Sequence, residues 1–206
     1  MDNHSQKSIR AYDRKADSYD NTFDGKFTEK FKNFLLQTLA AEDGDCVLDV
    51  GCGNGTLLSR IAKLKSIQGF GTDISPQMIK NAAAHYPEFK FAVSGCESIP
   101  FDDSSMDVIT TCAAYHHFPD VGAFANEVKR LLKQDGNLYI AEIYLPPAIR
   151  QFCNIFLPLS KDGDVKFYSS KEIGQTFSQV GFAPVKTVTR GHIQIVHLKP
   201  VLVASP

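Results

Sequence analysis

The chain lacks the features of a membrane-bound or secreted protein. No run of apolar residues approaches the roughly eighteen that a membrane-spanning helix needs, and residues 1–4, MDNH, do not resemble the start of a signal peptide. The five cysteines are odd in number and form no CxxC pair, which argues against a disulfide framework and a zinc site. We therefore expect a cytoplasmic protein with reduced thiols and no membrane span.

An excess of charge of one sign is missing as well. The 22 lysines and arginines nearly cancel the 23 aspartates and glutamates, so the chain has no basic footprint for nucleic acid. No internal repeat or low-complexity segment is visible. At 206 residues and 43% hydrophobic composition, the chain can bury one sizeable core but is too short for two full domains.

Several catalytic and metal-binding patterns are also absent. The sequence contains no H-x-E or H-E-x-x-H motif, and no Ser/His/Asp set stands out. His85, His192 and His197 each stand alone, and a lone histidine is most often structural. The sequence therefore predicts no metal site.

The stretch CVLDVGCGNGT (46–56) is the most informative segment that is present. Its apolar start is typical of a parallel strand covered on both faces. Gly51 and Gly53 allow the backbone to turn sharply and a ligand to lie against it. About twenty residues later, Asp73 ends a second predicted strand, where its carboxylate can take both hydroxyls of a ribose. This βαβ arrangement predicts an adenosine-containing cofactor.

The spacing of the glycines argues against dinucleotides. Thr56 stands where the dinucleotide fingerprint G-x-G-x-x-G has its third glycine. No lysine follows in the manner of a P-loop, which excludes a triphosphate cradle. A glycine pattern on its own is weak, because such glycines can simply shape a tight turn between strand and helix.

Hydrophobic periodicity predicts strands and helices in alternation. Alternation of this kind indicates an α/β fold in which a mostly parallel sheet is covered by helices on both faces, with ligands beyond the carboxyl ends of the strands. The predicted strands lie at 46–50, around 70, and at 89–93, 108–112, 138–143, 185–189 and 192–198; the predicted helices lie at 27–39, 57–64, 76–85, 120–132 and 169–181.

Four ordered segments resemble the motifs of class I S-adenosylmethionine-dependent methyltransferases. VLDVGCGNGTLL (47–58) resembles the first motif, GTDISPQMI (71–79) the second, and the segment 94–120 the third and fourth. The resemblance runs from about Tyr12 to Lys199 and is nearest to the small-molecule branch (methyltransferase type 11), which includes the ubiquinone/menaquinone-biosynthesis C-methyltransferases. It implies a Rossmann-like sheet of seven strands with an antiparallel last strand, and S-adenosyl-L-methionine as the cofactor.

The resemblance also implies a division of a single domain over residues 1–206. Residues 1–40 would form an N-terminal helical lid, 41–143 the cofactor-binding core, 144–168 a cover over the acceptor site, and 169–206 a C-terminal helix and strand hairpin. The apolar residues at helical spacing in 144–168 could instead pack on the sheet or against a second subunit. The sequence leaves open whether the protein is a monomer or a homodimer.

Roles for individual residues follow from the resemblance. Asp49 and the backbone of Gly51, Cys52 and Gly53 would hold the methionine amino group, and Asp73 the ribose. Three alternatives stay open, because Asp73 can instead cap the next helix, Met78 can be plain core, and Tyr19 can be a simple anchor of the terminus. The other residues expected around the cofactor are Ile74 and Met78 against the adenine, Tyr19 of the lid as an aromatic wall near the sulfonium, and Gly95, Cys96, Glu97, Cys112 and His117.

One departure from the family pattern concerns the adenine amino group. Many relatives carry an acidic residue after the third strand, and that position here is Gly95 if Glu97 is aligned with the usual glutamate. Glu97 itself could accept from the amino group or could be solvated. The departure puts the affinity for the cofactor in doubt.

The expected reaction is transfer of a methyl group to a small, partly hydrophobic molecule by in-line displacement. His116, on the loop expected to face the methyl group, is the candidate general base, and Glu142 is a candidate acceptor contact. Two other functions remain, a catalytically degenerate module that binds S-adenosylmethionine and a nicotinamide-dependent oxidoreductase.

Overall fold

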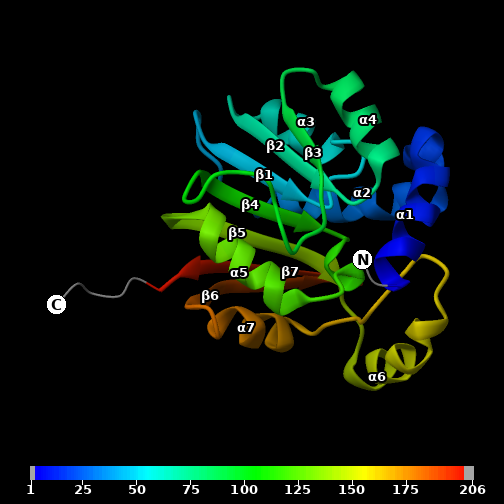
Figure 1. Ribbon diagram of the computed structural model, residues 1–206. Coiled ribbons are helices and arrows are strands. Elements are labelled where there is room, and N and C mark those ends of the chain that lie inside the picture. The colour runs from blue at the N-terminus through cyan, green and yellow to red at the C-terminus, as the bar shows by residue number, and fades with distance from the viewer. Residues whose placement is uncertain (1–2, 202–206) are drawn as a thin grey trace.

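The computed structural model describes residues 3–201, apart from the side chain of Pro158. Its centre is one seven-stranded sheet in the order β3-β2-β1-β4-β5-β7-β6, with helices on both faces (Figure 1). The strands from β3 to β5 pair in parallel, and β7 is antiparallel to both β5 and β6. The expected α/β fold is confirmed. The strands are β1 Cys46–Val50, β2 Gln68–Asp73, β3 Lys90–Val93, β4 Met106–Cys112, β5 Leu132–Ile143, β6 Phe182–Arg190 and β7 Ile193–Pro200.

The helices follow the predicted alternation, with additions at the N-terminus and after β5. Helix α1 and the short 3-10 helix η1 precede the first predicted helix, and α6 with η3 occupies the long connection between β5 and α7. The α-helices are α1 Asn3–Lys15, α2 Phe23–Leu36, α3 Thr56–Ala62, α4 Pro76–His85, α5 Val121–Leu131, α6 Pro147–Phe156 and α7 Ser170–Ser178; the 3-10 helices are η1 Ala16–Asn21, η2 Tyr115–His117 and η3 Leu157–Leu159.

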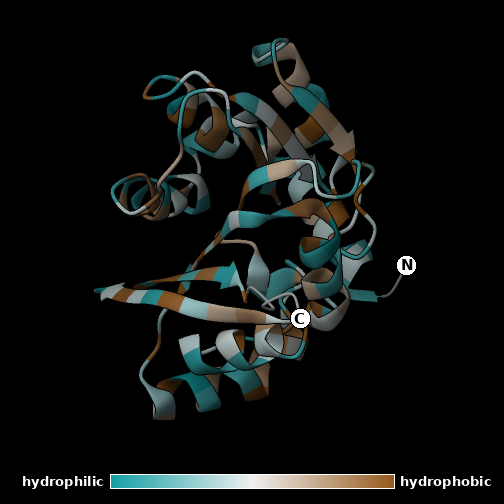
Figure 2. Cartoon of the chain, turned by 90° about the vertical axis from the view of Figure 1, so that its left-hand side faces the viewer, coloured by the Kyte–Doolittle hydropathy of each residue, from teal (hydrophilic) through white to brown (hydrophobic). Residues whose placement is uncertain are grey.

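Alternate residues of the central strands build two apolar cores. In β4, Val108 packs in the cluster formed with α2 and α3, whereas its neighbour Ile109 packs in the cluster formed with α5 and α7. Successive side chains of a strand point to opposite faces, so a run of apolar residues is needed where both faces are covered. The helices carry both hydrophobic and hydrophilic residues, as expected for elements with one buried face (Figure 2).

Side-chain caps begin α4, α5 and α7. The Ser75 hydroxyl accepts from Met78 N at the start of α4, and Asp120 accepts from Ala123 N at the start of α5. Ser169 and Glu172 form a reciprocal capping box at α7. Strand β5 begins earlier than predicted, at Leu132, because Leu132 still pairs with Met106 across a register shift.

The strand order reverses next to β1, which places a crevice at the carboxyl ends of β1, β2 and β4. Helices α1 and α6 both lie beyond these strand ends (Figure 1). Within residues 3–201, no helix is long and apolar enough to cross a membrane.

We expect Phe124→Ala to destabilise the fold strongly. Phe124 is fully buried and its ring contacts Tyr115, Phe118 and Phe177, so the truncation leaves a cavity between α5, α7 and the sheet. The expected loss is about 3–5 kcal/mol in the free energy of unfolding, measured by chemical denaturation. Phe23→Ala is the matched control, since Phe23 is 82% exposed; an equal loss in both variants would contradict the assignment of this core.

Candidate cofactor and acceptor site

The glycine turn after β1 lies against the ends of two neighbouring strands. The backbone N–H groups of Gly51 and Cys52 both donate to the carbonyl of Thr72 in β2, at 2.7 and 2.9 Å. Gly51 has φ +77°, and a Cβ there would lie 2.5 Å from the Cβ of Ala114, which follows β4. Only glycine therefore permits this backbone conformation and this close approach.

Asp73 fixes the same turn from the end of β2. One oxygen of its carboxylate accepts from Gly53 N and the other from Ser75 N, each at 2.9 Å. The bond from Ser75 N shows that Asp73 also helps to cap the start of α4, which is the alternative role that the sequence left open. Each oxygen retains a lone pair, because a carboxylate offers about four acceptor sites, and Asp73 lines the adjoining pocket. Burial raises the pKa of the Asp73 carboxyl, although the N–H donors oppose the shift.

One pocket gathers nearly all the residues expected around the cofactor. The space between its lining residues is about 930 Å³, part of which is open solvent. The expected residues that line it are Tyr19, Gly51, Cys52, Gly53, Asp73, Ile74, Met78, Gly95, Cys96, Glu97, Cys112 and His117; Asp49 and His116 do not line it.

Asp49 immediately precedes Val50 and Gly51, which line the pocket. Its side chain is 2% exposed and accepts a hydrogen bond from the Thr110 hydroxyl at 2.7 Å. Burial raises the pKa of Asp49 to about 7, while the Thr110 hydrogen bond and the charge of Lys32 act in the opposite direction. A cation bound above the glycine turn would favour the ionised form of this carboxyl.

Glu97 occupies the space that a side chain at position 95 would need. A Cβ on Gly95 would collide with a carboxylate oxygen of Glu97, and both residues line the pocket. The glutamate thus brings an acceptor to the place left vacant by the glycine. From the sequence alone, Glu97 could accept from the adenine amino group or be solvated. In the fold, Glu97 lines the pocket.

The N-terminal segment closes one side of the pocket. Tyr12 of α1 and Tyr19 of η1 both line it, with ring centroids 6.0 Å apart. Asp13 accepts from the Ser75 hydroxyl at 2.5 Å and from Gln77 N at 3.1 Å, which fastens α1 to the start of α4. The Ala16 carbonyl accepts from the Asn54 amide at 3.0 Å. These bonds hold the aromatic pair over the glycine turn.

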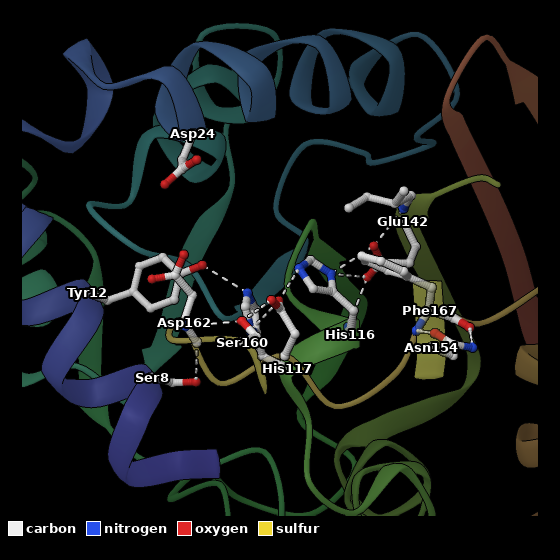
Figure 3. Close-up of polar contacts among 12 residues, drawn as sticks. Ser8, Tyr12, Asp24, His116, His117, Glu142, Asn154, Ser160, Asp162 and Phe167 are labelled. Atoms are coloured by element: carbon white, nitrogen blue, oxygen red, sulfur yellow. Dashed lines mark hydrogen bonds and ion pairs between the residues drawn. The ribbon is translucent and has the colours of Figure 1, made fainter. Parts of the chain in front are cut away.

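The two adjacent histidines of η2 have different surroundings. His116 is 7% exposed, and Glu142 accepts from its backbone N–H at 3.0 Å and pairs with its Nδ1 at 2.9 Å (Figure 3). His117 lies against Tyr12, whose hydroxyl is 2.8 Å from Nε2. Burial lowers the pKa of His117 well below its usual value. Burial also opposes the charged form of His116, but Glu142 outweighs this effect and raises its pKa.

Glu142, a candidate acceptor contact from the sequence, is fully buried and does not line the pocket. Besides His116, it accepts from its neighbour Ile143 N at 2.6 Å. Because Glu142 bonds to both the backbone N–H and the Nδ1 atom of His116, it positions the His116 side chain.

Sequence reasoning missed one buried cation in the pocket. Lys32 is one of the buried residues of α2, is 9% exposed and lines the pocket. Its ammonium group donates to the Thr56 hydroxyl at 2.5 Å and pairs with Glu29 at 3.3 Å. The available signal was a lysine one residue after Phe31 in the buried stripe of the helix.

The segment 144–168 does not line this pocket. Helix α6 has no buried residue, and Phe152 and Ile155 are 63% and 70% exposed. Its apolar residues therefore do not pack on the sheet.

Part of the chain matches a known protein family, and the matched part includes residues of the pocket. Residues 48–140 match the family described as "Methyltransferase domain". This segment is therefore similar to a methyltransferase domain. The resemblance to methyltransferases recognised from the four sequence motifs is confirmed over this segment.

Curated proteins similar to this chain include two methyltransferases. It is 35% identical over 100 residues to a demethylmenaquinone methyltransferase of Chlorobaculum tepidum, a match that covers 48% of this chain and 41% of the relative. It is 34% identical over 152 residues to the uncharacterized methyltransferase YcgJ of Bacillus subtilis, covering 70% and 59%. The chain thus spans less than two thirds of either relative.

Solved structures show the same fold. A chain from the complex between the Haloferax volcanii Trm112 methyltransferase activator and a methyltransferase aligns with a TM-score of 0.82 and 21% identity, covering 93% of this chain and 98% of that chain. A SAM-dependent methyltransferase from Aquifex aeolicus aligns with a TM-score of 0.63 and 21% identity, covering 86% and 98%.

The buried carboxyl of Asp49 makes the stability of the ligand-free protein depend on pH. Its pKa rises from an ordinary value of 3.8 in the unfolded chain to about 7 in the folded one. The folded state therefore holds the proton more tightly, and its stability falls as the pH rises from about 4 to 7, by at most about 1.4 kcal/mol per pH unit.

Asp49→Asn should remove this loss, because an amide cannot ionise and its oxygen can still accept from Thr110. We expect the variant's advantage in the free energy of unfolding, measured by urea denaturation, to grow between pH 4.5 and pH 8. Parallel stability curves for variant and wild type would instead mean that Lys32 fully compensates the buried charge.

Proposed function

We propose that the protein binds S-adenosylmethionine in this pocket and transfers its methyl group to a small, partly hydrophobic acceptor. The observation that carries the proposal is the convergence of the glycine turn, the end of β2 and the closed N-terminal segment on one pocket. When bound, S-adenosylmethionine supplies an electrophilic methyl group and a neutral thioether leaving group, so in-line displacement needs little covalent help from the protein.

Four groups would bind the nucleoside end of the cofactor. The free lone pairs of Asp73 take the ribose hydroxyls, and Ile74 and Met78 pack against the adenine. The carboxylate of Glu97 accepts from the adenine amino group. All four side chains line the pocket.

The amino-acid end would lie between Lys32 and the glycine turn. The ammonium group of Lys32 pairs with the cofactor carboxylate, and the buried Asp49 favours a cation above it through its charge. Opposite charges at short range in a buried site interact strongly, because little solvent screens them. The aromatic faces of Tyr12 and Tyr19 attract the sulfonium and exclude water.

The acceptor would enter from the side of His117 and Phe118. Apolar groups at this end, including Ala113 and Pro119, favour a ring or chain with hydrophobic surface, and the name of the Chlorobaculum relative supports an acceptor of quinone type. His116 does not reach the pocket surface in this conformation. Positioning and exclusion of water therefore contribute more to the proposed reaction than a general base.

The first experiment is calorimetric titration with S-adenosylmethionine, S-adenosylhomocysteine and 5′-methylthioadenosine, which lacks the amino-acid end. Asp73→Asn should weaken all three ligands by about 10-fold or more, since a hydrogen bond to a charged group contributes about 1.5–3 kcal/mol. Asp102→Asn, the same change on an exposed turn, should leave all three affinities unchanged.

Lys32→Met tests binding of the amino-acid end of the cofactor separately from binding of the nucleoside end. The variant keeps an unbranched side chain but loses the ammonium group, so we expect about 10-fold weaker binding of S-adenosylmethionine and its homocysteine product and unchanged binding of methylthioadenosine. Lys30→Met on the exposed face of the same helix is the control.

Other outcomes of the titration assign other functions. Binding of NADH in place of the three ligands would contradict the proposal and favour an oxidoreductase. Tight cofactor binding without methyl consumption across a panel of quinols, phenols and prenyl compounds would favour the degenerate binding module.

A further inference from the structure

We propose that His116, His117 and Asp164 form a binding site for a divalent transition-metal ion of the zinc type. The site lies between the acceptor side of the pocket and the loop that precedes α7. This inference goes beyond the proposed methyl transfer and does not depend on it.

The three ligand atoms lie close enough to share one ion. Asp164 Oδ1 is 3.5 Å from His116 Nε2 and 3.2 Å from His117 Nδ1, and all three atoms lie within 4.8 Å of one another. Zinc bonds to imidazole nitrogen and carboxylate oxygen are about 2.0–2.2 Å long, so tetrahedral ligand atoms are about 3.3–3.5 Å apart. The two distances to the carboxylate already match this spacing.

Neighbouring groups orient each ligand toward the same point. Glu142 pairs with His116 Nδ1 at 2.9 Å, which leaves Nε2 to face the cluster. The Tyr12 hydroxyl lies 2.8 Å from His117 Nε2, which leaves Nδ1 to face the cluster (Figure 3). The other Asp164 oxygen accepts from the Ser160 hydroxyl at 2.5 Å. Carboxylate–histidine pairs of this kind fix the tautomer and raise the basicity of metal-ligating histidines.

The His117 Nδ1 atom supplies an independent sign that a partner belongs here. It is buried and makes no hydrogen bond of good geometry, although Asp164 Oδ1 lies 3.2 Å away and the backbone of Gly163 also interacts with the His117 ring. Buried polar atoms are normally satisfied, so an unsatisfied one calls for an explanation such as an ion. A metal on the Nδ1 side would provide it.

The donor types indicate the class of ion. Two imidazoles and one carboxylate suit zinc, cobalt, iron or nickel, whereas magnesium and calcium prefer oxygen ligands alone. Three protein ligands also leave a fourth position open, as in zinc sites that bind water or a substrate oxygen.

The ion would join segments that are distant in the sequence. His116 and His117 follow β4, Asp164 lies in the loop before α7, and Tyr12 reaches the site from α1. That loop is already bonded to α1, because the Ser8 hydroxyl donates to the Asp162 carbonyl at 3.0 Å. Metal binding would therefore stabilise the closed arrangement of the N-terminal segment over the pocket.

The test is titration of the chelator-treated full chain with zinc chloride by calorimetry and with cobalt(II) by visible absorption. We expect one ion per chain in the micromolar range or tighter, the visible bands of a low-symmetry cobalt site, and a rise in the thermal unfolding midpoint with zinc. Magnesium should bind at least 100-fold more weakly.

Matched variants identify the ligands. Asp164→Asn and, separately, His117→Gln should weaken zinc at least 10-fold and abolish the cobalt bands. Glu142→Gln should weaken zinc about 10- to 100-fold through the orientation of His116. Asp162→Asn, in the same loop but paired with Lys15, should bind zinc like the wild type.

Three results would overturn the proposal. The first is that the wild type shows no saturable zinc binding. The second is that both ligand variants bind zinc as tightly as the wild type. The third is that magnesium binds as tightly as zinc. Each can occur with or without binding of S-adenosylmethionine, so failure of the metal site and failure of the cofactor site are distinguishable.

Discussion

The carboxylate of Asp73 connects the glycine turn of β1 to the neighbouring strand, and the candidate site depends on this connection. One oxygen holds the N–H of Gly53 and the other that of Ser75. These bonds bring the turn after β1 and the start of α4 to one carboxylate at the strand ends. They add to the bonds from Gly51 and Cys52 to the Thr72 carbonyl, which hold the same turn against β2.

A second layer of contacts places the N-terminal segment over this framework. Asp13 bonds to the start of α4, Tyr12 to His117, and the Ala16 carbonyl to Asn54. Each of these partners lies in a segment that directly follows β1, β2 or β4. The N-terminal segment therefore lies on the same edge of the sheet as the proposed cofactor pocket, and its aromatic rings are part of the pocket wall.

Buried charge is concentrated at this edge and is mostly held by specific partners. Asp49 accepts from Thr110, Lys32 contacts Thr56 and Glu29, and Glu142 holds His116. Burying such groups costs free energy unless they are paired or bind a ligand. Their presence next to a pocket is the arrangement expected of a site adapted to a charged ligand rather than to stability alone.

The sequence by itself determined the local chemistry of the chain. Alternating strands and helices, the caps at Ser75 and Ser169, and the glycine turn with Asp73 all depend on neighbours within a few residues or on one βαβ unit. Only the tertiary structure decided which distant polar groups meet. Lys32 and Glu97 enter the pocket, His116 turns to Glu142, and Asp164 reaches both histidines because packing of helices on the sheet sets these distances. No local periodicity encodes them.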